Sequence, residues 1–193
     1  MVVQERTTSA EELWELSHRP EHADQRLELV EGIVRVMSPT GGQHGAVASK
    51  ADRLISDFVE EHGLGYTTAA ETGYVLFKNP DGRDTVRAPD VGFVRADRLP
   101  EGLPEGYIPF APDLAVEVVS PGDAASDIHD KVHDFLRYGT RLVWVLYPKS
   151  RTATVHTPEG AHTVDAQGAL DGGDVLPGFS LRLGELFSVL NTR

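Results

Sequence analysis

Apolar side chains recur along the chain with the spacing of amphipathic helices in three places. The clearest case is residues 44–62, where apolar positions repeat at three- and four-residue steps and a glycine follows the last turn. The same spacing predicts a second helix over 126–138. A shorter helix is predicted over 8–17, with Thr8 or Ser9 as its N-cap.

Other segments are rich in β-branched and apolar residues and are bounded by turn sequences, which predicts strands. Residues 26–39 read as a hairpin that turns at Glu31-Gly32, and the tail from residue 151 is antiparallel in character. The remaining runs are 66–78 and 84–95, joined by the turn sequence "NPDGRD", and then 113–119 and 141–148. From residue 44 to 148 the order is helix, strand, strand, strand, helix, strand. This order predicts an α/β protein with a central mixed β-sheet flanked by helices and extra antiparallel β elements at both ends.

Composition narrows the class of protein. With 193 residues we expect one domain over 1–193. No apolar run is long enough for a membrane span, and the absence of cysteine agrees with a cytoplasmic protein. The net charge of −12 argues against a protein that coats nucleic acid. It does not exclude a nuclease, because bound divalent cations would offset acidic residues at the site.

Two acidic residues stand alone among apolar neighbours in the central strands. Glu117 interrupts "LAVEVVSP" (114–121), and Asp90 interrupts "VRAPDVGFV" (86–94). A carboxylate buried in this way requires a cation, a hydrogen-bond donor or a metal beside it. Pro89 cannot donate to a strand ladder, so we expect a bend or bulge next to Asp90. Two carboxylates on neighbouring strands can hold one Mg²⁺; the alternative is that each pairs with an arginine or caps a loop.

Lys131 falls on the apolar side of the helix predicted over 126–138. It lies three residues after Ile128 and four before Phe135. A lysine there either extends its ammonium to solvent or reaches the end of the neighbouring strand, where Glu117 lies. In the second case the ammonium can orient water and stabilise charge on a phosphate.

The histidines are weaker candidates for site residues than Asp90, Glu117 and Lys131. His129 and His133 have the i, i+4 spacing of a metal pair, but no third ligand is evident and they lie off the apolar stripe, which favours an exposed face. His44, at the start of the long helix, either contacts a site or has a local structural role.

Taken together, "RLELVEGIVRVMSP", "APDVGFV", "DLAVEVVSP", "KVHDFLRYG" and "LVWVLYP" resemble the Uma-type restriction endonuclease family of the PD-(D/E)XK nuclease superfamily. The resemblance covers about residues 10–187 and implies a restriction-endonuclease-like fold. It implies that Asp90 and Glu117 are metal ligands and catalytic residues, with the backbone carbonyl of Val118 completing the metal shell. The superfamily's lysine two residues after the second acid is Val119 here, and Lys131 takes its place in the Uma-type pattern.

Glu28, His44 and Glu71 also occupy positions that match the family, as possible supporting residues. The resemblance implies Mg²⁺-dependent (or Mn²⁺-dependent) hydrolysis of phosphodiester bonds in DNA by a cytoplasmic protein, with a homodimer as a possible assembly and no membrane partner. Two other functions stay open. One is a non-catalytic nucleic-acid-binding or regulatory module on the same fold, which the net charge and the displaced lysine favour. The other is a metal-dependent hydrolase of another phosphate ester.

Overall fold

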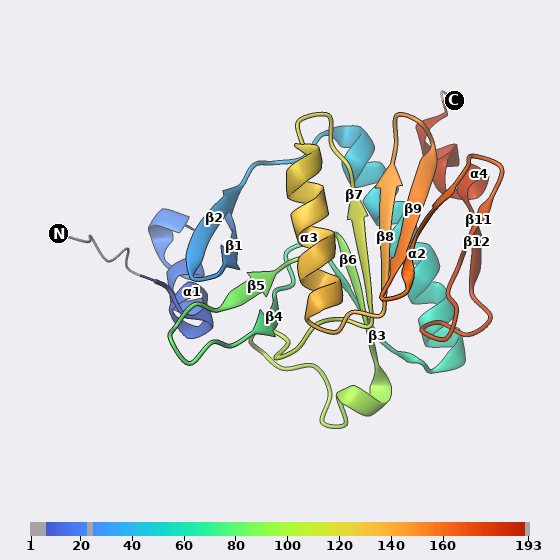
Figure 1. Cartoon of the computed structure of the whole chain (residues 1–193). Helices are drawn as coiled ribbons and strands as arrows, with labels where there is room; N and C mark the ends of the chain where they lie inside the picture. Colours follow the sequence, from blue (N-terminus) through green and yellow to red (C-terminus); the bar gives the residue numbers. More distant parts are fainter. Residues whose placement is uncertain (1–6, 23–24, 192–193) are drawn as a thin grey trace.

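A six-stranded mixed sheet forms the centre of the computed structural model, which describes residues 7–22 and 25–191 (Figure 1). The strands lie in the order β10-β9-β8-β7-β6-β3, and only β7 and β8 run parallel, because a helix connects them. Their bounds are β3 Gly65–Ala69, β6 Val91–Arg95, β7 Leu114–Val118, β8 Leu142–Tyr147, β9 Thr152–Thr157 and β10 Gly160–Val164. The α/β fold class and the mixed sheet predicted from sequence are confirmed.

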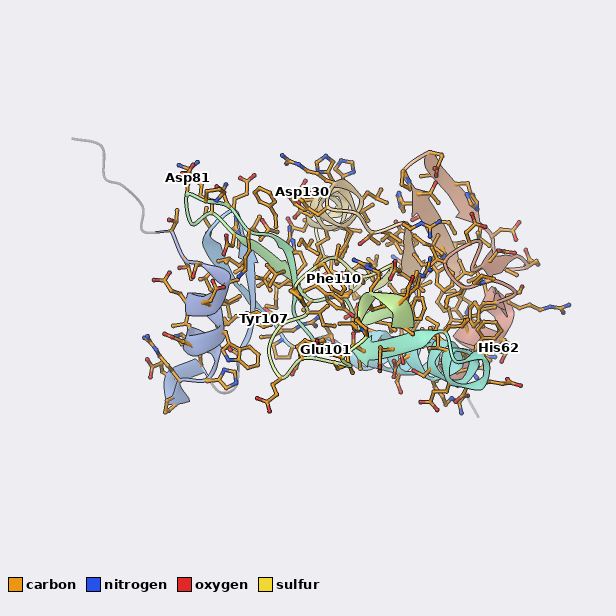
Figure 2. The ribbon with its side chains drawn as sticks, turned by 90° about the horizontal axis from the view of Figure 1, so that it is seen from below. His62, Asp81, Glu101, Tyr107, Phe110 and Asp130 are labelled. Atoms are coloured by element: carbon orange, nitrogen blue, oxygen red, sulfur yellow. The ribbon has the colours of Figure 1, made fainter. Side chains whose placement is uncertain are left out.

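Helices α2 (Gly42–His62) and α3 (Ala125–Arg137) cover opposite faces of this sheet. Alternation along β7 directs Val116 into the core cluster under α2 and Ala115 into the cluster under α3. Figure 2 shows the same layering from below, with Asp130 of α3 and His62 of α2 on opposite sides of the molecule. Glu117, two residues after Ala115, therefore faces α3.

A smaller antiparallel sheet, in the order β2-β1-β5-β4, lies to one side of the main sheet (Figure 1). Its strands are β1 Arg26–Val30, β2 Ile33–Met37, β4 Tyr74–Phe77 and β5 Thr85–Arg87, and α1 (Ala10–Ser17) packs against it. The predicted hairpin is confirmed, because Glu31 and Gly32 form the turn with positive φ angles of 49° and 81°. Ser9 is the N-cap of α1 in a capping box with Glu12.

The two strand-like runs predicted over 66–78 and 84–95 form four strands instead of two. Each run divides between the two sheets: β3 pairs with β6 in the main sheet, and β4 pairs with β5 in the smaller one. Pro89 lies in the break between β5 and β6, where it has no N–H for a ladder, and Asp90 follows at a bend. The bend expected from Pro89 is confirmed, and it turns the chain from one sheet into the other just before Asp90.

Two further features complete the fold. Helix α2 begins at Gly42, two residues earlier than predicted, because Gly41 is its extended N-cap; His44 therefore lies inside the first turn. The C-terminal part carries the expected antiparallel elements, β9, β10, β11 (Ala169–Asp171) and β12 (Ser180–Arg182), followed by α4 (Leu183–Leu186). Within residues 7–22 and 25–191, no helix combines the length and apolar character that crossing a membrane requires.

Candidate active site

A cleft of about 860 Å³ opens between the smaller sheet, helix α3 and the loop that precedes α2. Asp90, Glu117 and Lys131 all line it, as do Glu28 and His44. A second cavity of about 510 Å³ shares residues 37–40, Asp90 and His44 with the first. The predicted carboxylates therefore face one common cleft instead of opposite faces of the sheet.

Asp90 is buried and held by two hydrogen bonds to the same oxygen. The backbone N–H of Val118 donates to Oδ2 at 2.8 Å, and His44 Nε2 lies 3.0 Å from that oxygen. Because a carboxylate only accepts, His44 Nε2 carries the proton. The other oxygen, Oδ1, lies 3.8 Å from Arg26 Nη1. Burial raises the pKa of Asp90, but His44, the Val118 N–H and Lys131 outweigh it, so that the net shift is downward and Asp90 is ionised.

Glu117 is the residue most affected by burial. Its Oε2 accepts a hydrogen bond from Lys131 Nζ at 3.0 Å, and its Oε1 is buried with no hydrogen-bond partner among the described residues. Burial raises the pKa of Glu117 to about 7, and the charges of Asp90 and Glu28 add to this rise against the opposing effect of Lys131. The two predicted ligands therefore differ, because Asp90 is stabilised as an anion and Glu117 is not.

Lys131 points into the cleft, as one of its two predicted orientations required. Its side chain is 9% exposed, and Nζ lies 3.0 Å from Glu117 Oε2 and 3.2 Å from Glu28 Oε1. Burial lowers the pKa of Lys131, but the two carboxylates outweigh it and hold this pKa above its ordinary value. The ammonium is therefore charged at neutral pH.

Arg87 joins this cluster, although its sequence pattern did not single it out. Its Nη1 donates to Glu28 Oε2 at 3.0 Å, while Nε and Nη2 donate to Asp134 Oδ2 at 2.9 and 2.6 Å. Glu28 is fully buried and also accepts from the Ala88 N–H at 3.2 Å. The one feature of the sequence that could have indicated Arg87 is its position two residues before Pro89. Because the chain bends there and Asp90 follows, Arg87 is brought close to the site.

Comparison with known proteins identifies the family of this chain. A family model described as "Putative restriction endonuclease", Uma2, matches residues 10–184. The chain belongs to the Uma2 family. The crystal structure of a "putative nuclease belonging to DUF820" from Anabaena variabilis ATCC 29413 superposes with a TM-score of 0.80 at 20% sequence identity, covering 95% of this chain and 99% of that chain. This likeness shows a shared fold. The curated proteins searched include no match.

The charges of this Uma2 protein's cluster do not balance. Four carboxylates interact with three permanent cations, which leaves one negative charge in excess; the residues are Glu28, Asp90, Glu117, Asp134, Arg26, Arg87 and Lys131. Glu28 has two cationic partners and Glu117 has one. Burial raises the pKa of Glu117, whereas the pKa values of Glu28 and Asp90 are lowered by their partners, so ionisation is least favourable at Glu117, where a bound cation would offset the charge.

The residues of the Uma2 site fit a hard divalent cation. Glu117 offers a buried oxygen without a hydrogen bond, and Asp90 Oδ1 makes only a long ion pair. The Val118 N–H donates to Asp90 Oδ2, so the end of β7 that carries the Val118 carbonyl lies beside Asp90. No group of three or more His, Cys, Asp or Glu side chains converges as a metal cluster in residues 7–22 and 25–191. Two carboxylates, a carbonyl and waters are ligands of the kind that Mg²⁺ accepts.

Three candidate residues lie apart from this cluster of the Uma2 protein. Glu71 is exposed, has a positive φ of 78°, and lines only the second cavity. His129 and His133 are exposed on α3, as predicted, although His133 also lines the cleft. His44, by contrast, lies 3.0 Å from Asp90 Oδ2, so of the two roles left open by the sequence the structure shows the contact with a candidate site residue.

Proposed function

We propose that this protein is a metal-dependent endonuclease that hydrolyses phosphodiester bonds in DNA with Mg²⁺ or Mn²⁺. The observation that carries the proposal is the meeting of Asp90, Glu117 and Lys131 in one cleft, with the lysine ammonium 3.0 Å from Glu117. Membership of a restriction endonuclease family supports the reaction class.

Asp90, Glu117 and the backbone carbonyl of Val118 would hold the metal. A bound divalent cation supplies Lewis-acid polarisation of the phosphate and lowers the pKa of a bound water. His44 and the Val118 N–H hold Asp90 in place by occupying its Oδ2. This leaves Oδ1 as the oxygen available to a cation.

Lys131 acts as a charged donor and not as a base, because its carboxylate neighbours keep it protonated. An ammonium has three N–H bonds, and contacts with Glu117 and Glu28 occupy two of them. The third can orient a water or donate to a phosphate oxygen on which negative charge develops. Such preorganised donors are worth about 10²- to 10³-fold in rate.

The cleft is lined by more acidic than basic side chains, so bound divalent cations would have to offset part of this charge for a polyanionic substrate to enter. Two exposed arginines on its walls are the candidate phosphate contacts. Arg35 pairs with Glu28 across β1 and β2, so its side chain lies on the same face and lines the cleft, where it is exposed. Arg137, at the last turn of α3, lines the cleft from the opposite wall and is also exposed. These arginines can contact phosphates on either side of the catalytic cluster.

A cleavage assay with plasmid DNA and single-stranded DNA, with Mg²⁺, Mn²⁺ or EDTA, tests this function. We expect cleavage by the wild type only with metal, and none by Asp90→Ala or Glu117→Ala. Circular dichroism checks that both variants fold, because Glu117→Ala removes a buried charge whereas Asp90→Ala leaves the Val118 N–H and His44 without their acceptor. Asp84→Asn is the matched control, since Asp84 is a buried carboxylate that bonds the backbone of Ala10 and Asn79 outside the cleft.

Two outcomes would overturn the proposal in favour of its rivals. Metal-dependent DNA binding without any cleavage would indicate a non-catalytic binding module. Turnover of small phosphate esters, with DNA left intact, would indicate a different metal-dependent hydrolase. Cleavage by both alanine variants at the wild-type rate would place the activity elsewhere in the molecule.

A further inference from the structure

We infer that Glu28 and Arg87 are positioning residues for the Lys131 ammonium: Glu28 holds it beside Glu117, and Arg87 holds Glu28 and helix α3 in register. This inference rests on the proposed nuclease function. It assigns a role to two buried residues of the cleft lining that take no part in the proposed reaction.

Lys131 is shared between carboxylates from two different sheets. Glu117 comes from β7 of the main sheet and Glu28 from β1 of the smaller one, at 3.0 and 3.2 Å from Nζ. A lysine side chain is flexible and lacks the rigid, planar set of donors that arginine has, so one partner alone constrains the position of its ammonium poorly. Two partners on opposite sides fix where the ammonium lies.

Glu28 is suited to holding the lysine and unsuited to binding a metal. Its Oε1 contacts Lys131 Nζ and the Ala88 N–H, and its Oε2 contacts Arg87 Nη1. Both oxygens are therefore in use, whereas Glu117 keeps one oxygen without a partner among the described residues. Glu28, Asp90 and Glu117 are the buried carboxylates that line the cleft. Their contacts leave Asp90 and Glu117 as candidate metal ligands and Glu28 as a positioning residue.

Arg87 connects the three elements that carry the site. Its guanidinium binds Glu28 on β1 and Asp134 on α3, and its own strand leads through Pro89 to Asp90. Asp134 lies three residues after Lys131, which puts both on one side of the helix. By holding Asp134, Arg87 therefore sets the rotation of α3 that points Lys131 into the cleft.

A purely structural role for this network is the competing explanation, and a double substitution separates the two. Single-turnover cleavage with saturating Mg²⁺ is measured for wild type, Glu28→Gln, Lys131→Met and the double variant. If Glu28 acts through Lys131, Glu28→Gln slows wild-type cleavage by on the order of 10- to 100-fold, the size expected when a reacting group is misplaced. The same change should then leave the Lys131→Met rate unaltered. Equal slowing in both backgrounds would overturn the inference.

Arg87→Lys is the second variant. It keeps the positive charge but loses the planar guanidinium, whose N–H groups donate to two carboxylates at once. One ammonium cannot reproduce the contacts with both Glu28 and Asp134, so we expect the same slowing as in Glu28→Gln, with the Mg²⁺ midpoint unchanged. A wild-type rate for Arg87→Lys would show that charge alone suffices, and would overturn the role of Arg87. Asp84→Asn controls for destabilisation of the smaller sheet and should cleave at the wild-type rate per folded molecule.

A crystal structure of Glu28→Gln tests the positioning without any need for activity. We expect Lys131 Nζ to leave its position beside Glu117. An unchanged contact of about 3.0 Å between Nζ and Glu117 Oε2 would overturn the inference. If the wild type cleaves no DNA under any condition, the proposed function fails. The crystal structure of Glu28→Gln still tests whether Glu28 holds the Lys131 ammonium in place.

Discussion

Replacing Glu117 with glutamine should stabilise the metal-free protein at alkaline pH. Glutamine has the shape of the protonated carboxyl and cannot ionise, so the substitution removes a charge that the fold opposes. Glu117 has its pKa raised from 4.5 to about 7 by burial, and its Oε1 has no hydrogen-bond partner among the described residues. Lys131 keeps its contact with Glu28 in the variant.

The sign and size follow from proton linkage. Between pH 4.5 and 7 the folded protein binds a proton at Glu117 that the unfolded chain has released, so wild-type stability falls as pH rises through this window. At 1.36 kcal/mol for each pH unit, the difference from Glu117→Gln reaches about 3 kcal/mol at pH 8. It shrinks to about 1 kcal/mol or less at pH 5. For a protein of this size, 3 kcal/mol corresponds to a melting temperature higher by roughly 6–12 °C.

Urea unfolding of the two metal-free proteins at pH 5 and pH 8 measures this difference. The pH 5 pair is the internal control, because both side chains are then uncharged in the folded state. Saturating Mg²⁺ should stabilise the wild type and not the variant, which reduces the gap. A Glu117→Gln protein that is no more stable than wild type at pH 8 would refute the view that the metal-free site carries an uncompensated buried charge.

The other predictions concern the metal, the lysine and the substrate. Mg²⁺ affinity measured by calorimetry should rise as pH increases toward about 7 and level off above it, because Glu117 must lose its proton to bind a cation; a constant affinity from pH 5 to 8 would contradict this. Lys131→Met should lower cleavage about 10²-fold or more while Mg²⁺ binding persists, since the ligands are carboxylates; wild-type cleavage would show that the ammonium plays no part. Arg35→Ala should weaken DNA binding and reduce the salt dependence of binding by about one phosphate contact, measured by fluorescence anisotropy over a salt series; an unchanged salt slope would exclude this contact.

The sequence by itself determined the faces on which Glu117 and Lys131 lie. Alternation along 114–119 set Glu117 on the face opposite Val116, and helical spacing set Lys131 on the buried side of its helix; the structure confirms both. The bend expected at Pro89 is also present. These features follow from short-range periodicity and from the missing N–H of proline, which act within one element whatever surrounds it.

Only the tertiary structure decided which side chains meet. Glu28 and Arg87 are 59 residues apart in the sequence, and Arg87 and Asp134 are 47 apart. No local sequence pattern predicts either contact, because each depends on how the smaller sheet packs beside α3. The division of residues 66–78 and 84–95 between two sheets escaped prediction for the same reason: both halves read as strand, and strand propensity does not specify a partner. Periodicity predicts the face on which a residue lies, but the packing of one element against another decides which residue it contacts. The carboxylates and the lysine could therefore be predicted from the sequence, and the network of contacts that holds them could not.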